Sequence, residues 1–218
     1  MKLKPAFFPL VVGLGFGLAS ANTLAQQSTK SWYGGLSIGQ SKVKFDDNVL
    51  PVAGATATSL SKNETDTGYK AYVGYRLHQN FAVEGGYTDF GKISATRTMT
   101  APAVGTFHAD VKASGWHVDA VGIWPMQNNF SLFGKLGVIF NEVKTSLGTT
   151  GAVALPAGTN TSPKHSGSNL KLGIGAGYEF TPTVGARVEW ERASKLGDDS
   201  TGGKSDVDLL SVGVVFRF

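Results

Sequence analysis

The chain ends in LLSVGVVFRF (209–218), a run in which apolar side chains alternate with small or polar ones at a period of two. The residues of the apolar face are Leu210, Val212, Val214, Phe216 and Phe218. This period is typical of a β-strand whose two faces meet different surroundings. Because a chain terminus usually frays, a strand that is completed by a final aromatic residue is unusual for a soluble protein. The pattern predicts an outer-membrane β-barrel strand with its apolar face towards lipid.

The first 25 residues have the three parts of a secretory signal peptide. Two lysines near the start precede an apolar segment (7–18), and small residues then allow cleavage after Ala21 or Ala25. The apolar segment is too short and too rich in glycine to favour a membrane-spanning helix. We therefore expect a signal peptide over 1–25 and a single barrel domain over 26–218.

The composition excludes several classes of protein. The chain has no cysteine, so it has neither a disulfide nor a thiolate site. Its net charge of +4 includes two lysines of the signal peptide, which leaves no basic field that would favour nucleic acid. After the signal peptide, no apolar run approaches the length of a membrane helix. The 29 glycines suit the crowded interior of a small barrel.

Eight alternating segments follow the signal peptide. We expect strands at about 32–45, 65–77, 80–90, 111–124, 129–144, 168–180, 184–193 and 206–218. The second, fourth and sixth strands are followed by short turns. The other connections are long and polar, and cover about 46–64, 91–110, 145–167 and 194–205. Outer-membrane barrels have short periplasmic turns and longer external loops. The sequence therefore predicts an all-β, eight-stranded antiparallel up-and-down transmembrane β-barrel, with both termini in the periplasm and the last strand paired with the first.

Aromatic residues gather near the ends of the expected strands, as in the interfacial girdles of membrane barrels. The expected girdle residues are Trp32, Phe81, Trp124, Phe130, Phe180 and Phe218 at the periplasmic end, and Trp116, Phe140 and Trp190 at the other end.

Several stretches resemble the OmpA-like transmembrane barrel. They are WYGG (32–35), FAVEGGYTDFG (81–91), GWHVDAVG (115–122), NFSLFGKLG (129–137) and the final strand ending in Phe218. The resemblance implies an eight-stranded barrel of the Gram-negative outer membrane, with structural, adhesive or weakly pore-forming roles. Many family members carry a C-terminal periplasmic domain that grips peptidoglycan. Because this sequence stops at the eighth strand, we do not expect it to tether the cell wall.

The inward faces of the expected strands carry charged side chains. We expect a lumen charge network of Asp66, Lys70, Arg76, Glu84, His117, Asp119, Lys135, Lys171, Glu179, Arg187, Glu189 and Glu191. Charges in a narrow lumen of low dielectric constant must pair or stay hydrated. An eight-stranded barrel leaves an interior that side chains can fill.

The short turns fix a register that predicts which of these charges meet. The expected pairs are Asp119 directly opposite Lys135 and, on diagonals, Arg76 with Glu84, Glu179 with Arg187, and Lys171 with Glu191. Two interpretations stay open. The pairs either rigidify a closed barrel, or exchange partners to open a thin water path, in which case changing Lys135 should alter the single-channel current.

The histidines do not favour an enzyme or a metal site. His78, His108, His117 and His165 are far apart in the sequence, without the paired spacing of metal ligands. The segment HSGS (165–168) lacks the His-x-Ser spacing of outer-membrane lipid A deacylases. We therefore expect no catalytic residues, metal or cofactor, and a lipid A-modifying hydrolase is a remote alternative.

The expected function is structural, with surface display on four external loops. A low-conductance pore and a loop-borne adhesin or receptor are the alternatives. We expect a monomer that contacts outer-membrane lipid and lipopolysaccharide, and that the barrel-assembly machinery recognises through its last strand. The loops are candidates for a host or phage ligand. The lysines expected near lipopolysaccharide phosphates are Lys42, Lys44, Lys112 and Lys144.

Overall fold

A computed structural model describes residues 31–43, 56–101, 104–152, 158, 160–198 and 203–218. The expected signal peptide, and Lys44 among the lysines named above, lie outside these residues. The described part contains no helix that is long and apolar enough to cross a membrane.

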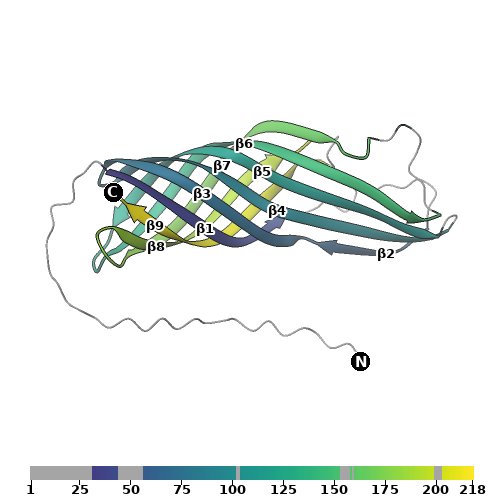
Figure 1. The fold of residues 1–218 in the computed structure, drawn as a ribbon, viewed down its shortest axis with the longest axis horizontal. Coiled ribbons are helices and arrows are strands. Elements are labelled where there is room, and N and C mark those ends of the chain that lie inside the picture. Colours follow the sequence, from purple (N-terminus) through teal and green to yellow (C-terminus); the bar gives the residue numbers. More distant parts are fainter. Residues whose placement is uncertain (1–30, 44–55, 102–103, 153–157, 159, 199–202) are drawn as a thin grey trace, which may run out of the picture.

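The described chain is built almost entirely of antiparallel strands (Figure 1). They are β1 (Ser31–Val43), β2 (Thr56–Asn63), β3 (Thr65–His78), β4 (Phe81–Ala101), β5 (Gly105–Pro125), β6 (Phe130–Gly151), β7 (Lys164–Glu179), β8 (Val184–Leu196) and β9 (Ser205–Arg217). Apart from β2, which pairs only with β4, each strand pairs with the next barrel strand along the chain (β1 with β3), as in an up-and-down meander.

The sheet closes on itself into a ring of eight strands. The ring runs β4–β3–β1–β9–β8–β7–β6–β5, and pairing between β4 and β5 completes it. Pairing of β1 with β9 joins the two ends of the barrel sequence, with Tyr33 opposite Arg217. The eight-stranded closed barrel is thus confirmed. Closure matters because an open sheet edge in lipid leaves backbone polar groups without hydrogen-bond partners.

The strands extend further than the sequence predicts at the end opposite the short turns. The fourth strand element, β4, continues to Ala101 instead of 90, β5 begins at Gly105, and β6 continues to Gly151. The predicted loop over 91–110 is therefore wrong over most of its length, and the predicted loop over 145–167 is wrong at its two ends, 145–151 and 164–167.

Strand β2 also lies in a predicted loop, 46–64, and pairs with the outer part of β4. Figure 1 shows β2, β4, β5 and β6 running past the other strands. We call this projecting sheet the extension. Its strands are rich in threonine, a good strand former, but lack the apolar alternation on which the prediction relied.

The short turns lie where the sequence predicts them, between β3 and β4, β5 and β6, and β7 and β8. In the second, Asn128 and Asn129 have φ of 59° and 63°, in the left-handed region that asparagine tolerates well. These turns share one end of the barrel with Ser31 and Arg217, and we call it the turn end.

The two faces of the strands differ as the alternation predicts. On β9, Leu210 and Val212 are more than half exposed on the outside, while Leu209 and Ser211 are buried in the lumen. The same outward apolar face continues around the barrel in Leu36, Leu136 and other exposed aliphatic residues. A wide apolar band facing outwards, around a polar interior, is the arrangement that a bilayer requires.

Candidate functional site

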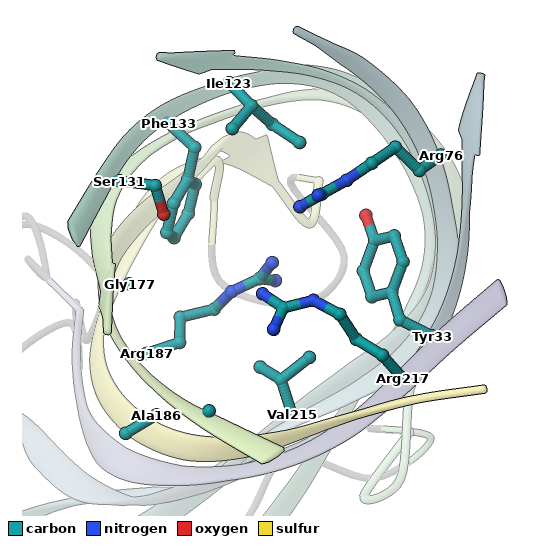
Figure 2. A pocket seen from close by; sticks show the side chains of 11 residues that line it. Tyr33, Arg76, Ile123, Ser131, Phe133, Gly177, Ala186, Arg187, Val215 and Arg217 are labelled. Carbon is teal, nitrogen blue, oxygen red and sulfur yellow. The ribbon is translucent and has the colours of Figure 1, made fainter. Parts of the chain in front are cut away.

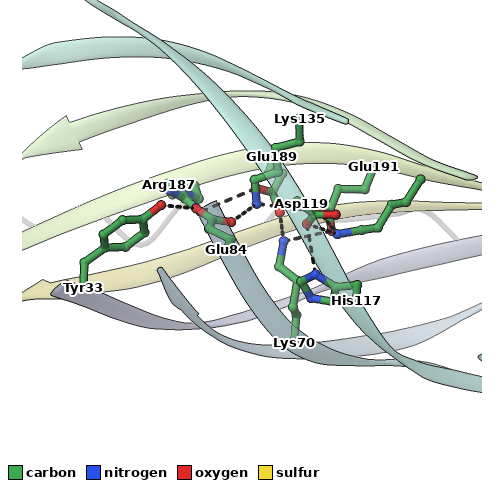
Figure 3. Close-up of polar contacts among 10 residues, drawn as sticks. Tyr33, Lys70, Glu84, His117, Asp119, Lys135, Arg187, Glu189 and Glu191 are labelled. Carbon is green, nitrogen blue, oxygen red and sulfur yellow. Dashed lines mark hydrogen bonds and ion pairs between the residues drawn. The ribbon is translucent and has the colours of Figure 1, made fainter. Parts of the chain in front are cut away.

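A group of nine ionisable side chains fills the centre of the barrel, and we call it the central network (Figure 3). Its members are Lys70 of β3, Glu84 of β4, His117 and Asp119 of β5, Lys135 of β6, Lys171 of β7, and Arg187, Glu189 and Glu191 of β8. All are buried, because alternate residues of every strand point into the lumen.

Glu84 organises the half of the central network nearer the turn end. Its carboxylate accepts hydrogen bonds from the Tyr33 hydroxyl at 2.8 Å and from Arg187 Nη1 at 2.8 Å. Lys135 Nζ lies 2.6 Å from the other carboxylate oxygen. Lys135 also lies 2.6 Å from Glu189, so it links Glu84 to the carboxylates of β8.

The other half of the central network centres on Glu191. Lys70 contacts both Glu189 and Glu191, the latter at 2.8 Å. Lys171 Nζ lies 2.6 Å from Glu191 and 2.8 Å from Asp119. His117 Nδ1 is 2.9 Å from the Asp119 carboxylate. The contacts thus form one continuous chain, visible in Figure 3, from Tyr33 to His117.

Charge within the central network is balanced when His117 is neutral. Four acidic side chains (Glu84, Asp119, Glu189 and Glu191) face four basic side chains (Lys70, Lys135, Lys171 and Arg187). Buried ions are tolerated when each has close partners of opposite sign. The arrangement can therefore hold charge in the lumen without a bound counter-ion.

Apolar layers lie on both sides of the central network. The layer on its turn-end side is formed by Tyr33, Tyr72, Ala82, Val121, Phe133 and Val215. The layer on the side of the extension includes Val43, Phe90, Ile93, Ile139, Val143, Leu196, Val207 and Leu209. A cavity of about 40 Å³ in the second layer has mainly apolar walls. The centre is thus enclosed by side chains in both directions along the barrel.

Aromatic rings of the turn-end layer contact the cations directly. The Arg187 guanidinium carbon lies 4.5 Å from the centre of the Phe133 ring and 4.8 Å from that of Tyr72. Lys135 Nζ lies 5.4 Å from the Tyr72 ring centre. Such cation–π contacts stabilise positive charge in a site with little water. Sequence reasoning missed Tyr33 and Tyr72, although both alternate inwards on their strands.

The predicted pair of Asp119 with Lys135 is wrong. It assumed that Trp124 faces Phe130 across the turn, whereas Trp124 faces Leu132. The longer turn shifts the register by two residues, so Asp119 lies opposite Gly137 instead. Its carboxylate then meets Lys171 and His117.

The β7–β8 register matches the predicted one. The β3–β4 register does so from Arg76 onwards, beyond a bulge that places Phe81 opposite His78. These registers produce the expected contact only for Lys171 with Glu191. Arg187 binds Glu84, and not Glu179 as predicted. Glu179 instead lies 2.7 Å from Arg217, a residue absent from the predicted network. The inward position of Arg217 on the alternating last strand was the signal that pointed to it.

Two further predicted members of the network lie away from it. Asp66 is only half buried. Its carboxylate accepts a hydrogen bond from the backbone N–H of Lys92, beside a bulge in β4. Gly91 has φ of +81° at that bulge, which a side chain would strain. Arg76 is diagonal to Glu84 as the register requires, but it lines a cavity at the turn end that Arg187 also lines, and no ion pair joins it to a carboxylate of the described residues.

The predicted girdle residues point outwards, with one partial exception. The predicted girdle residues at the turn end are 51–78% exposed: Trp32, Phe81, Trp124, Phe130, Phe180 and Phe218. At the other end, Trp116 and Phe140 are opposite one another and exposed. Trp190 is half buried, with the Arg192 guanidinium carbon 5.3 Å from its ring centre.

Four lysines stand in register on adjacent strands, on the outer surface beyond Trp116 and Phe140. Lys92 faces Lys112, Lys112 faces Lys144, and Lys144 faces Lys164, and we call them the lysine row. Their partners are acidic: Asp110 lies 3.3 Å from Lys92, Asp89 3.0 Å from Lys112, and Glu142 2.6 Å from Lys144.

These acids tune the charges of the lysine row. The hydrogen bond to Glu142 raises the pKa of Lys144. Hydrogen bonds from Ser94 and then Lys92 lower the pKa of Asp110. Both shifts favour the charged forms of Lys144 and Asp110.

His165 Nδ1 lies 2.8 Å from the Asp198 carboxylate near the outer rim, a histidine–acid pair of the kind that hydrolases use. A hydrolase also needs a nucleophile within hydrogen-bond reach of the histidine. Among the described residues, no hydroxyl group donates to the His165 ring. The described residues also contain no group of three side chains that is placed to hold a metal ion.

Comparison with known proteins gives a family match over the whole barrel. The OmpA-like transmembrane domain family matches residues 27–218. Outer membrane protein A of Salmonella typhi is 27% identical over 210 residues, which cover 95% of this chain and 54% of that protein. The chain spans about half the length of the outer membrane protein A relatives it matches.

A second relative and a solved structure also match the chain. An uncharacterised protein of Coxiella burnetii is 25% identical over 198 residues, which cover 83% of this chain and 78% of that protein. The crystal structure of neisserial surface protein A aligns with a TM-score of 0.54 at 16% identity, covering 86% of this chain and 97% of that chain. That structural likeness supports the barrel fold alone.

Proposed function

Because the chain belongs to the OmpA-like transmembrane domain family and is an outer-membrane barrel, we propose that it acts as a structural, non-conducting barrel that displays the extension outside the cell. The observation that carries the proposal is the central network, enclosed by two apolar layers. An ion that crosses the lumen must break several buried ion pairs and pass both layers. That barrier argues against the pore alternative.

The direction of the barrel follows from the lengths of its connections. Outer-membrane barrels keep their short turns in the periplasm and their longer connections outside. We therefore place the turn end in the periplasm and the extension at the cell surface. The strands of the extension form a rigid scaffold for the outer connections. Because binding loops are often presented on rigid scaffolds, this also supports the adhesin alternative.

Labelling of single cysteines in whole cells tests this placement. Since the chain has no native cysteine, Ser162→Cys at the outer end and Gln127→Cys in a short turn each report one position. A membrane-impermeant maleimide should label Ser162→Cys in intact cells, and Gln127→Cys only after the outer membrane is opened.

Both variants should fractionate with the outer membrane and migrate as compact, heat-modifiable bands, which serves as the control for folding. Labelling of Gln127→Cys in intact cells, with Ser162→Cys protected, would reverse the proposed orientation and refute surface display of the extension.

The lysine row supports a second proposal, that the outer surface binds phosphate groups of lipopolysaccharide. Like charges that lie directly opposite one another on neighbouring strands destabilise a sheet. The side chains of Lys92, Lys112 and Lys144 are 47–60% exposed, so an external anion can reach their ammonium groups beside the acidic partners. A phosphorylated lipid would relieve the repulsion between them.

Binding of lipopolysaccharide by the folded protein in uncharged micelles tests this proposal. The double variant Lys112→Gln, Lys144→Gln should bind about 30-fold more weakly, since each of the two lysines contributes about 1 kcal/mol near an anionic surface. The matched control, Lys195→Gln with Lys204→Gln, removes the same charge elsewhere and should bind as the wild type does. Equal losses in both double variants would show a general charge effect and no site.

A further inference from the structure

Three arginines converge in a cavity at the turn end, inside the ring of strands (Figure 2). Arg76 comes from β3, Arg187 from β8 and Arg217 from β9, and Figure 2 shows their guanidinium groups pointing towards the middle of the lumen. Tyr33, Phe133 and Ser131 complete much of the wall. The cavity has a volume of about 30 Å³, which exceeds that needed for one water molecule.

The three arginines differ in how their charge is matched. Arg187 lies 2.8 Å from Glu84 and belongs to the balanced central network. Arg217 lies 2.7 Å from Glu179. Among the described residues, no carboxylate forms an ion pair with Arg76. Of the two cavity arginines outside the central network, Arg217 thus has a carboxylate partner in Glu179, while Arg76 has none among the described residues.

Two nitrogen atoms in this cavity are buried without a hydrogen-bond partner. They are Nε of Arg76 and Nη1 of Arg217. Buried polar groups are nearly always hydrogen-bonded, so donors without partners point to an acceptor or to water. Cations this close also repel one another, and a negative group between them would remove both costs.

We propose that this cavity binds a small oxyanion of one or two negative charges, a carboxylate or phosphate group, between Arg76 and Arg217. The planar forks of N–H donors on arginine match the paired oxygens of such groups. One negative charge also brings the two cations and Glu179 to neutrality. The ring of strands closes the cavity towards the bilayer, so the anion enters from the turn end, which lies in the periplasm if the proposed orientation holds.

Titration of the purified barrel with inorganic phosphate tests the proposal directly. The protein is labelled with ¹⁵N-arginine and held in uncharged maltoside micelles, with ionic strength kept constant by sodium chloride. The expected result is a saturable shift of the Nε–H signals of Arg76 and Arg217. Arg76→Gln should bind phosphate at least about tenfold more weakly, with Arg76→Lys between it and the wild type.

Arg192→Gln is the matched control. Arg192 lies in the half of β8 away from the turn end, pairs with Asp208 of β9, and does not line the cavity. It should bind phosphate as the wild type does. No saturable shift in the wild type, or equal weakening by Arg192→Gln and Arg76→Gln, would overturn the proposal. A repeat in phospholipid bicelles distinguishes the source: shifts with phospholipid but none with free phosphate would assign the site to a headgroup and overturn the soluble anion.

The wild-type titration does not depend on whether any variant folds. It also separates this inference from the proposed function, since a barrel that is displayed in the opposite orientation would still bind phosphate in micelles.

Discussion

The central network and the lysine row contain the same kinds of charge on neighbouring strands, but in opposite surroundings. Lys135 is fully buried and lies within 2.6 Å of both Glu84 and Glu189. Lys112 is 53% exposed and lies 3.0 Å from Asp89. Water compensates for a lost partner at the surface but cannot do so in the lumen. The difference teaches that position, more than residue type, decides what each ion pair contributes to stability.

The largest effect should come from Lys135→Met in the central network. The change leaves Glu84 and Glu189 buried without their shared cation, which should lower the free energy of unfolding by about 3–5 kcal/mol. Urea unfolding in micelles measures it. The double variant with Glu84→Gln should recover part of the loss. A loss below about 1 kcal/mol would mean that water reaches the centre and that the comparison fails.

A positive charge introduced at Leu136, the residue after Lys135, should also destabilise the barrel, because this side chain points outwards into lipid. Leu136 is exposed to lipid midway along the span of β6. Leu136→Arg should cost about 2–4 kcal/mol, because the bilayer centre offers the cation no partner. Leu136→Ile is the control and should unfold nearly as the wild type does. Tolerance of arginine at this position would contradict the lipid-facing assignment of this face.

An added methyl group beside the central network should have a smaller effect. Gly137 lies opposite Asp119, and a Cβ there would collide with the Asp119 carboxylate and the Val118 carbonyl oxygen. We expect Gly137→Ala to lose about 1–3 kcal/mol, as overpacked sites do. Gly122→Ala is the matched control, since a Cβ at Gly122 meets nothing within 4 Å. Equal stability of the two variants in urea would refute tight packing around Asp119.

The smallest effect should follow Lys112→Gln in the lysine row. Exposed ion pairs contribute about 0–1 kcal/mol, and salt weakens them further. Relief of repulsion from Lys92 and Lys144 should offset part of the lost contact with Asp89. Unfolding at low and high salt measures both terms. A loss as large as that of Lys135→Met would remove the contrast between the two regions.

The faces of the strands were predictable because one period governs them. Alternation in 206–218 correctly separated Leu209 from Leu210, and it placed most of the central network in the lumen. The register between β7 and β8 was predictable too, because a short turn allows few ways of pairing the two strands. Lys171 accordingly contacts Glu191.

The remaining contacts depend on features that strand pairs do not show. Glu84 of β4 meets Lys135 of β6, and Lys70 of β3 meets Glu191 of β8, although neither pair of strands is adjacent in the ring. Those contacts cross the lumen, so they depend on the stagger of the whole barrel and on long side chains. The β5–β6 turn is also two residues longer than predicted. Asn128 and Asn129 have left-handed backbone conformations there, and their residue types alone did not reveal this length.

Single-channel recording of the wild-type barrel in planar bilayers tests the closed interior most directly. A large porin added to the same membrane shows that current is detectable. Because the balanced central network and its two apolar layers fill the lumen, we expect the wild type to give no steps above bare lipid. Steady, reproducible steps from the folded, heat-modifiable protein would contradict the closed interior.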